Sequence, residues 1–246
     1  MSVDEPSFAE FPAVDRDAWR QAVAKILKGA DFDRRMVTRT EDGLAIQPLY
    51  GADDPAGDAG APGAFPYVRS GRALDAAWRL EQRQAHPEPA TANKQALDDL
   101  EHGVEALRLA VADPLDDDPD GIVLTAPGEL ARVLDKVVTD AAPVSLEAGS
   151  RGLEMARALV ARWRESGADP AHVAGDLHLD PLAALSRTGR LPQSPADAFA
   201  EIAGFVGEVD GAFPEVRTLG IDLRPVHEAG AGPSLELAAG LAQAAE

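Results

Sequence analysis

"APVSLEAGSRGLEMARALVARWRESG", residues 142–167, is the stretch that decides the fold. A short apolar run predicts a strand over 142–149, and helically spaced apolar residues then predict a helix over 151–167 that ends at Gly167. The same order recurs three more times, with strands predicted over 104–112, 172–180 and 216–225 and helices over 127–138, 194–211 and 233–246. This alternation predicts parallel strands joined by right-handed crossovers.

The four strand–helix pairs predict an α/β fold for residues 104–246. A complete TIM-type barrel contains eight such pairs in roughly 250 residues. The segment therefore corresponds to about half of a TIM-type barrel. An open, doubly wound sheet of four strands is the alternative, because periodicity alone does not decide between the two.

Residues 1–103 predict a separate N-terminal region made of an arm, a hairpin and a helical extension. Apolar residues from Phe8 to Leu27 recur partly at helical spacing, so the arm is expected to end in a short helix. Residues 36–50 alternate around the pair Asp42-Gly43, which is a strong signal for a two-stranded hairpin.

The rest of the N-terminal region combines a loop with two helices. Residues 51–71 are dense in glycine, proline and aspartate and predict an exposed loop. Helices are predicted over 74–85 and 90–102, with Thr91 as a plausible cap of the second.

Composition excludes several classes of function. The formal net charge of −19 offers no basic surface for phosphates, so nucleic-acid binding is not expected. The sequence contains no cysteine, which removes disulfides and thiolate chemistry. The start of the sequence lacks the features of a signal peptide, and no apolar run is long enough for a membrane span. We expect a cytoplasmic protein with no membrane association.

Functional residues of parallel α/β folds gather at the carboxyl ends of strands. That rule selects a set of acidic and histidine side chains: Glu147, Asp176, His178, Asp180, Asp222, His227 and Glu228. Each acid could instead cap a helix or bind loop amides, and His178 could be a hydrogen-bonded core residue. Arg187, in "SRTG", offers a planar fork for a carboxylate or phosphate, or is simply a loop residue in solvent.

No metal site is predicted. His172 and His178 lie six residues apart, which fits no helical ligand pair, and the usual zinc signatures are missing from the sequence. "GDLHLD" is similar to the Asp-x-His-x-x-Gly motif that supplies a histidine to the cobalt of cobalamin domains. Pro181 stands where that motif requires glycine.

An ordered set of motifs resembles the methylmalonyl-CoA mutase family. The stretch "WRQAVAKILKGADFDRRMVTRTEDGLAIQPLY" is similar to the N-terminal signature of these enzymes, with a Trp-led helix, a Lys-Gly-x-x-Phe turn and a hairpin that ends in Pro-Leu-Tyr. The match continues in "GAFPYVRSG", "DLEHGVEALRL", "DPLAALSRTG" and "EAGAGPSLELAAGLA". It covers nearly the whole chain, and its details look most like the small, non-catalytic (beta) subunit of the two-subunit mutases.

Departures from the family pattern imply that the catalytic set has been lost. Catalytic subunits carry a tyrosine shortly after the Pro-aromatic-x-Arg-Gly element, but "SGRALDAAW" has none. Aligned on Glu228, Pro225 stands in place of their catalytic histidine, and His227 in place of a glutamine. A second catalytic glutamine would fall near His178, and a carboxylate-binding arginine would fall one position from Arg187. The resemblance therefore implies no catalytic residue in this chain.

Two functions follow as expectations. The resemblance implies a non-catalytic small subunit, or a fragment of one, that forms a heterodimer with a catalytic (large) subunit. That partner would bind adenosylcobalamin and interconvert methylmalonyl-CoA and succinyl-CoA, while this chain has no cobalamin-binding domain and would bind no cofactor alone. The alternative is a stand-alone acyl-CoA-binding protein or isomerase that uses His178, Arg187, His227 and Glu228. Because adjacent residues of a strand point to opposite faces, the last two could converge only at a turn.

Overall fold

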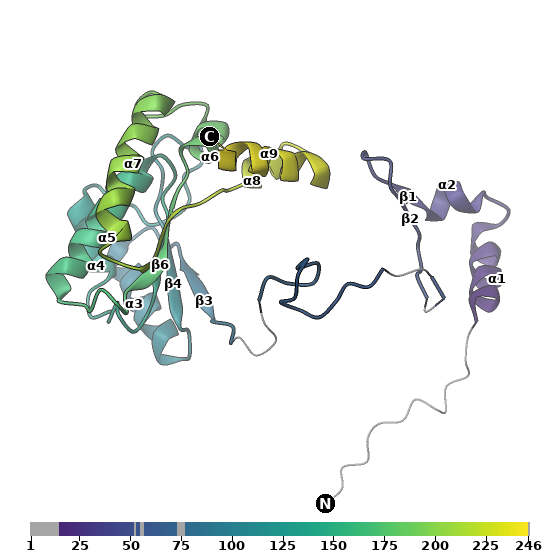
Figure 1. Ribbon diagram of the computed structural model, residues 1–246, viewed down its shortest axis with the longest axis horizontal. Helices are drawn as coiled ribbons and strands as arrows, with labels where there is room; N and C mark the ends of the chain where they lie inside the picture. Colours follow the sequence, from purple (N-terminus) through teal and green to yellow (C-terminus); the bar gives the residue numbers. More distant parts are fainter. Residues whose placement is uncertain (1–14, 52, 55–56, 73–76, 246) are drawn as a thin grey trace, which may run out of the picture. The chain divides into compact units, whose positions relative to one another are not determined.

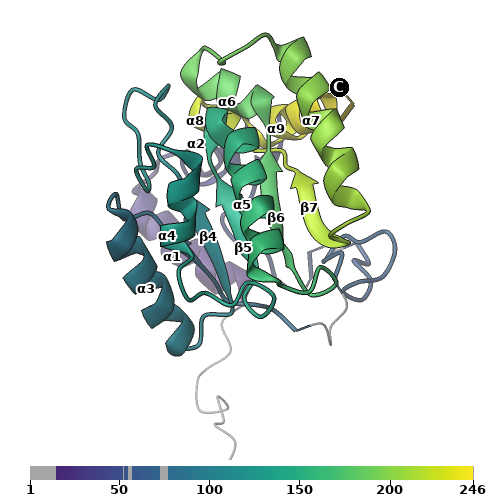
Figure 2. The same cartoon turned by 90° about the vertical axis from the view of Figure 1, so that its left-hand side faces the viewer.

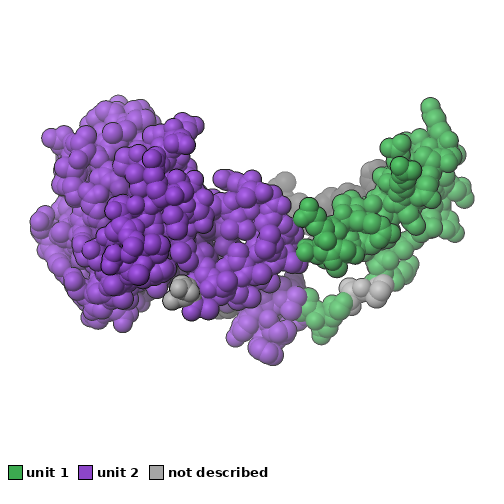
Figure 3. Space-filling model, turned by 90° about the horizontal axis from the view of Figure 1, so that it is seen from above, with its two compact units in different colours: residues 1–59 green, residues 60–246 purple. Residues whose placement is uncertain are grey.

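The computed structural model describes residues 15–51, 53–54, 57–72 and 77–245. Contacts divide the chain into two compact units, Met1–Ala59 and Gly60–Glu246 (Figure 3). The sequence analysis placed a boundary after residue 103 instead. Residues 1–14, which include the start of the predicted arm at Phe8, lie outside the described residues.

The first unit contains the predicted short helix and hairpin. Its elements are α1 (Arg16–Leu27), α2 (Phe32–Met36), β1 (Thr38–Arg39) and β2 (Ala45–Ile46). The two strands pair antiparallel, and Gly43 has a φ of 81° in the turn between them, so the predicted Asp-Gly hairpin is confirmed. Trp19 of α1 packs edge-on against Phe32 of α2, with ring centroids 6.0 Å apart, which joins the two helices.

The second unit is built on parallel strands, as predicted. A three-stranded sheet has the order β3 (Glu81–Gln84), β4 (Ala106–Ala110), β5 (Val144–Glu147), and a two-stranded sheet pairs β6 (Ala174–Leu179) with β7 (Glu215–Leu219). The two sheets meet where β6 lies beside β5: the N–H of Asp176 donates to Oγ of Ser145 at 3.3 Å. The described strands therefore follow one another in chain order (Figure 2).

Helices follow the strands, and four of them cover one face. They are α3 (Pro89–Glu101), α4 (Leu130–Val133), α5 (Gly152–Ser166), α6 (Pro181–Thr188), α7 (Pro195–Asp210), α8 (Arg224–Glu228) and α9 (Pro233–Ala245), with 3₁₀ turns at Pro127–Glu129 and Gly149–Arg151. In two perpendicular views α3, α4, α5 and α7 cover the same face of the strands (Figures 1 and 2). The α8 and α9 helices lie beyond the ends of the strands.

The core lies between these helices and the strands. On α5, Met155, Leu159 and Trp163 recur every four residues and are fully buried, as expected for a helix with one apolar stripe. Leu107 and Leu109 of β4 are also fully buried. Because successive strand residues point to opposite faces, the charged side chain between these two leucines lies on the face away from the helices.

The predicted helix over 74–85 is wrong. Residues 81–84 form β3, residues 77–80 are irregular, and 73–76 lie outside the described residues. The β3 sequence "EQRQ" has no apolar residue, so no strand pattern was visible. Its polar side chains have partners on both faces: Gln84 donates to Asp99 of α3 at 2.6 Å, and Arg83 pairs across the sheet with Glu147.

Smaller differences concern caps and element ends. The helix expected over 90–102 is confirmed as α3, but Glu88 caps it, accepting from the N–H groups of Ala90 and Thr91. The helix expected over 127–138 is only the 3₁₀ turn and α4. The last strand, expected over 216–225, ends at Leu219. Pro225 instead stands in the first turn of α8, where a missing N–H costs no hydrogen bond.

Candidate functional site

A pocket of about 380 Å³ lies at the carboxyl ends of β5 and β6, beside α6 and α8, and is called here the strand-end pocket. Main-chain and small apolar groups form part of its wall. Its charged and histidine side chains are Arg108, Glu147, His178, Asp180, Arg187, Asp222 and Arg224. The rule that functional residues gather at the carboxyl ends of parallel strands thus predicted the position of this pocket. The side chains of the pocket determine what it can bind.

Ion pairs join Glu147, Asp222 and Arg224 of this pocket to one another and to Arg83 beside it. The Glu147 carboxylate accepts from Nε of Arg83 at 3.2 Å and from Nη1 of Arg224 at 3.2 Å. Arg83 also pairs with Asp120 at 2.9 Å, and Arg224 pairs with Asp222 at 2.6 Å. The result is a continuous network of alternating charges in which each arginine contacts two carboxylates.

The pKa values of Glu147, Asp222 and Arg224 keep these three groups ionised. Burial by itself raises the pKa of Glu147, but the hydrogen bonds and charges of Arg83 and Arg224 outweigh it, so the pKa lies below the ordinary value. Asp222 behaves in the same way, because Arg224 outweighs burial and lowers the pKa of Asp222. The hydrogen bond from Arg224 to Asp222 also raises the pKa of Arg224. None of these groups is poised to exchange a proton near neutral pH.

His178 occupies an unusual backbone position at the end of β6. Its φ is 46°, in the left-handed region, and the register of β6 against β7 shifts between Asp176 and Leu179. A Cβ on Gly220 would lie 2.6 Å from Nδ1 of His178, so the ring fits only because residue 220 is glycine. The side chain is partly exposed to the pocket.

Nε2 of His178 faces a guanidinium and a carboxylate. Nη1 of Arg108 lies 3.0 Å from this nitrogen, and Oδ2 of Asp176 lies 3.6 Å from it. Arg108 is held in turn by Glu81 at 2.7 Å. His178 is therefore hydrogen-bonded, as the alternative interpretation expected, yet it lines the pocket.

Arg187 lies in the last turn of α6, where the sequence analysis placed a loop. Its Nε donates to Oδ2 of Asp116 at 2.6 Å, and its side chain lines the same pocket as His178. The structure thus brings Arg187 and His178 together. The guanidinium is already paired with a carboxylate and the side chain is 50% exposed, so Arg187 is a solvent-accessible helix residue rather than a loop residue.

His227 and Glu228 do not line the pocket. Both belong to α8, and Nδ1 of His227 lies 2.6 Å from Oε1 of Glu236 in α9, with 71% of the histidine side chain exposed. This hydrogen bond and the charge of Glu236 raise the pKa of His227. Glu228, the last residue of α8, is exposed. His227 therefore joins α8 to α9, and neither residue of the adjacent pair belongs to the pocket.

The residues around His178 do not fit a cobalamin ligand. Pro181 opens α6 where the cobalamin motif requires glycine, and Nε2 of His178 is engaged by Arg108. Within the described ranges, no group of three or more histidine, aspartate or glutamate side chains could hold a metal ion. The same part of the chain contains no helix with the length and apolar character needed to cross a bilayer.

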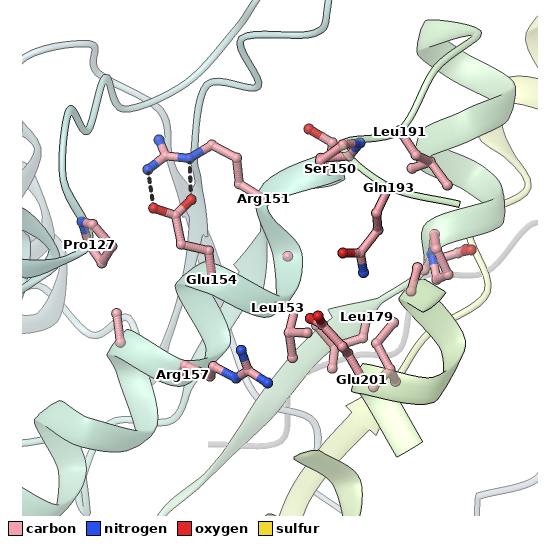
Figure 4. Close-up of a pocket in the computed structure, with 18 residues that line it drawn as sticks. Pro127, Ser150, Arg151, Leu153, Glu154, Arg157, Leu179, Leu191, Gln193 and Glu201 are labelled. Atoms are coloured by element: carbon pink, nitrogen blue, oxygen red, sulfur yellow. Dashed lines mark hydrogen bonds and ion pairs between the residues drawn. The ribbon is translucent and has the colours of Figure 1, made fainter. Parts of the chain in front are cut away.

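A second cavity, of about 620 Å³, lies between α5 and α7 (Figure 4). Leu153, Leu179, Leu191 and Ile202 contribute to its wall. Arg151 and Glu154 face one another at its edge, with 2.8 Å between Nε and Oε2. None of the four predicted binding residues lines this cavity.

Three arginines were not predicted from the sequence: Arg108 and Arg224, which line the strand-end pocket, and Arg83, which holds Glu147 beside it. Arg83 was assigned to a helix, and Arg108 lies inside a strand rather than at its end. Arg224 was placed in an overlong strand. A signal was present for Arg108, because a charge between the buried residues Leu107 and Leu109 must point away from the helices.

Comparisons with known proteins agree with the motifs. A sequence profile described as methylmalonyl-CoA mutase matches residues 39–246. The methylmalonyl-CoA mutase small subunit of Streptomyces virginiae is 37% identical over 97% of this chain and 38% of its own length. The probable small subunit of Mycobacterium tuberculosis is 32% identical over 99% of this chain and 40% of its own length.

A large subunit is also similar, at lower identity. The large subunit of Streptomyces virginiae is 23% identical over 96% of this chain and 34% of its own length. This chain thus spans less than half of the length of each of these relatives. On the profile match and the similarity to the small subunits, the chain belongs to the methylmalonyl-CoA mutase family.

Proposed function

We propose that this chain is part of a non-catalytic small subunit of an adenosylcobalamin-dependent methylmalonyl-CoA mutase. In this proposal it forms a heterodimer in the cytoplasm with a catalytic subunit, which interconverts methylmalonyl-CoA and succinyl-CoA. The catalytic subunit holds the cobalamin. This chain contributes contacts and stability and does no chemistry of its own.

The observation that carries the proposal is the internal pairing of charges in the strand-end pocket. A substrate carboxylate or phosphate needs donors that are free when it arrives, yet the pocket arginines Arg108, Arg187 and Arg224 each contact a carboxylate of the chain. Pro225, which stands where the resemblance places a catalytic histidine, has no side-chain proton to transfer. These features favour a supporting role over catalysis.

The two comparisons within one organism point the same way. The small subunit of Streptomyces virginiae is 37% identical to this chain, and the large subunit of that organism is 23% identical, over nearly the same share of the chain. The existence of a small and a large subunit in that organism supports a two-subunit enzyme. A catalytic subunit is therefore the partner we propose.

The arrangement of strands supports the half-barrel part of the proposal. The strands follow in chain order and the helices α3, α4, α5 and α7 share one face, whereas a doubly wound sheet has helices on both faces (Figure 2). Within the described residues, β3 and β7 each have one unpaired edge. We propose that β3 and α3 extend the predicted barrel segment 104–246, and that further strands close its edges in the assembled enzyme.

Co-purification tests the proposal. This chain is co-expressed with a tagged methylmalonyl-CoA mutase large subunit, and the complex is separated by size-exclusion chromatography. We expect one-to-one co-elution and a higher thermal stability of the large subunit in the complex. The tagged large subunit eluting alone, while this chain is folded and monodisperse, would speak against the proposal.

The free volume of the strand-end pocket favours one second candidate, a stand-alone acyl-CoA-binding protein. About 380 Å³ is open beside His178 and Arg187, enough for an acyl group. Calorimetric titration of the chain with methylmalonyl-CoA and succinyl-CoA, with and without cobalamin, distinguishes the two. A saturable heat of binding that is lost in Arg187→Ala would support the second candidate. The absence of any heat of binding would exclude it.

A further inference from the structure

The carboxylate of Glu147 lies between two guanidinium groups from distant parts of the chain. Nε and Nη2 of Arg83 approach its two oxygens at 3.2 and 3.3 Å, and Nη1 of Arg224 lies 3.2 Å from Oε1. The planar fork of arginine matches a carboxylate in this way when it binds an anionic ligand. The contacts are those of a bound carboxylate, with the ligand supplied by the chain itself.

Sheet register explains how Arg83 reaches Glu147 across an intervening strand. Arg83 of β3 is in register with Arg108 of β4, and Glu147 of β5 is in register with Ala110 of β4. Arg108 and Ala110 lie two residues apart on β4 and therefore point to the same face, and their register partners on β3 and β5 point to that face as well. All four side chains thus lie on the face away from the helices. Ala110 presents only a methyl group, so the Arg83 guanidinium can pass over β4.

Each guanidinium is also held by a second carboxylate. Asp120 contacts Arg83 at 2.9 Å, and Asp222 contacts Arg224 at 2.6 Å. The neighbouring Arg108 is neutralised separately by Glu81 at 2.7 Å. These contacts do not depend on Glu147, so the two guanidinium groups should keep their positions when Glu147 is replaced.

We propose that Arg83 and Arg224 form a carboxylate-binding cradle at the edge of the strand-end pocket, where Arg224 lines the pocket and Arg83 lies beside it, and that Glu147 fills this cradle as a built-in ligand that keeps external carboxylates out. The ligand class is a small monocarboxylate or the terminal carboxylate of a larger acid. The contacts of Glu147 with the two arginines support the cradle by themselves. Pairing of the chain with a catalytic subunit is not needed for it.

The test removes the built-in ligand from the full chain and offers acetate. Glu147→Ala and the wild type are titrated with ¹³C-acetate by NMR, and their thermal unfolding is followed in sodium acetate and in sodium chloride at equal ionic strength. We expect acetate to bind and stabilise Glu147→Ala but not the wild type. Adding Arg224→Ala should weaken acetate binding roughly tenfold, because it removes a charge-assisted hydrogen bond.

Glu154→Ala is the matched control. Glu154 also accepts two hydrogen bonds from one arginine, with Nε of Arg151 at 2.8 Å and Nη2 at 3.2 Å, but among the described residues no second arginine pairs with it. Its removal should create little acetate binding. A response of Glu147→Ala that is missing, or no larger than that of the wild type or Glu154→Ala, overturns the proposal.

Glu147→Ser keeps the test decisive if Glu147→Ala does not fold. The serine side chain is too short to take the place of the carboxylate between the two arginines, and its hydroxyl suits a polar surrounding better than a methyl group does. Acetate should then raise the midpoint of thermal unfolding of Glu147→Ser more than that of the wild type. Equal shifts in the two proteins would contradict the built-in ligand.

Discussion

Gly175 of β6 packs directly against the backbone of Val144 in β5, and a Cβ on the glycine would clash with the Val144 carbonyl. The φ of Gly175 is 151°, which L side chains rarely adopt. The three-stranded and two-stranded sheets therefore meet at a position that requires glycine for both space and conformation.

Gly175→Ala should lower the free energy of unfolding by at least about 2 kcal/mol, through overpacking and backbone strain. Chemical denaturation measures this. Gly204→Ala is the control: this glycine lies inside α7 with nothing within 4 Å of a built Cβ, so alanine should stabilise by up to about 1 kcal/mol. A Gly175→Ala protein as stable as the wild type would contradict the close junction.

Asp180 should contribute to stability through three hydrogen bonds, which come from α6, from α9 and from the segment between β7 and α8. Oδ1 accepts from the N–H of Ala183 in α6 and from Nε2 of Gln243 in α9, while Oδ2 accepts from the N–H of Asp222. Asp180→Ala should cost about 2 kcal/mol, more than loss of a helix cap alone. Asp180→Asn, which keeps one acceptor, should cost less. Equal stability of all three proteins in urea would refute this role.

Two substitutions of Trp163 should separate the contribution of packing to stability from that of the indole N–H group. The side chain is fully buried and its ring lies 5.5 Å from that of Phe213, but its Nε1 has no hydrogen-bond partner among the described residues. Trp163→Ala should cost about 3–5 kcal/mol. Trp163→Phe should cost much less, because it removes the unsatisfied donor along with some volume. Similar losses in the two variants would show that the N–H is satisfied.

His227 should make the contact between α8 and α9 dependent on pH. The hydrogen bond to Glu236 raises the pKa of His227, so the stabilisation is fully present below the unfolded-state pKa of about 6.5 and is lost as pH rises through the higher folded-state pKa. NMR titration of the ring measures this. In Glu236→Gln the pKa of His227 should return toward its ordinary value. An unchanged pKa in that variant would exclude the contact.

Local signals were sufficient for some elements. The α5 and α7 helices were predicted to within a residue or so at each end, because each combines an apolar stripe with clear terminal residues, Gly167 for α5 and Ser194-Pro195 for α7. The α6 helix was missed although Asp180-Pro181 is the same kind of signal. The β3 strand could not be recognised, because partners far along the chain rather than apolar residues hold it.

The candidate site was predictable only in part. The strand-end rule found Glu147 and His178, since it needs nothing more than the end of each strand. Their partners Arg83, Arg108 and Arg224 depend on sheet register and on the turn into α8, which the sequence does not specify locally. His227 was misplaced for the same reason, because a helix begins where a strand was expected to continue.

The most direct test of the supporting role is mutase turnover in the reconstituted complex. Wild type, His178→Ala and Arg187→Ala chains are each combined with the large subunit, adenosylcobalamin and methylmalonyl-CoA, and succinyl-CoA formation is measured alongside complex formation. We expect equal turnover per complex for all three, and none for this chain without the large subunit. Turnover that falls in either variant while the complex remains intact, or succinyl-CoA formed by this chain alone, would contradict the account.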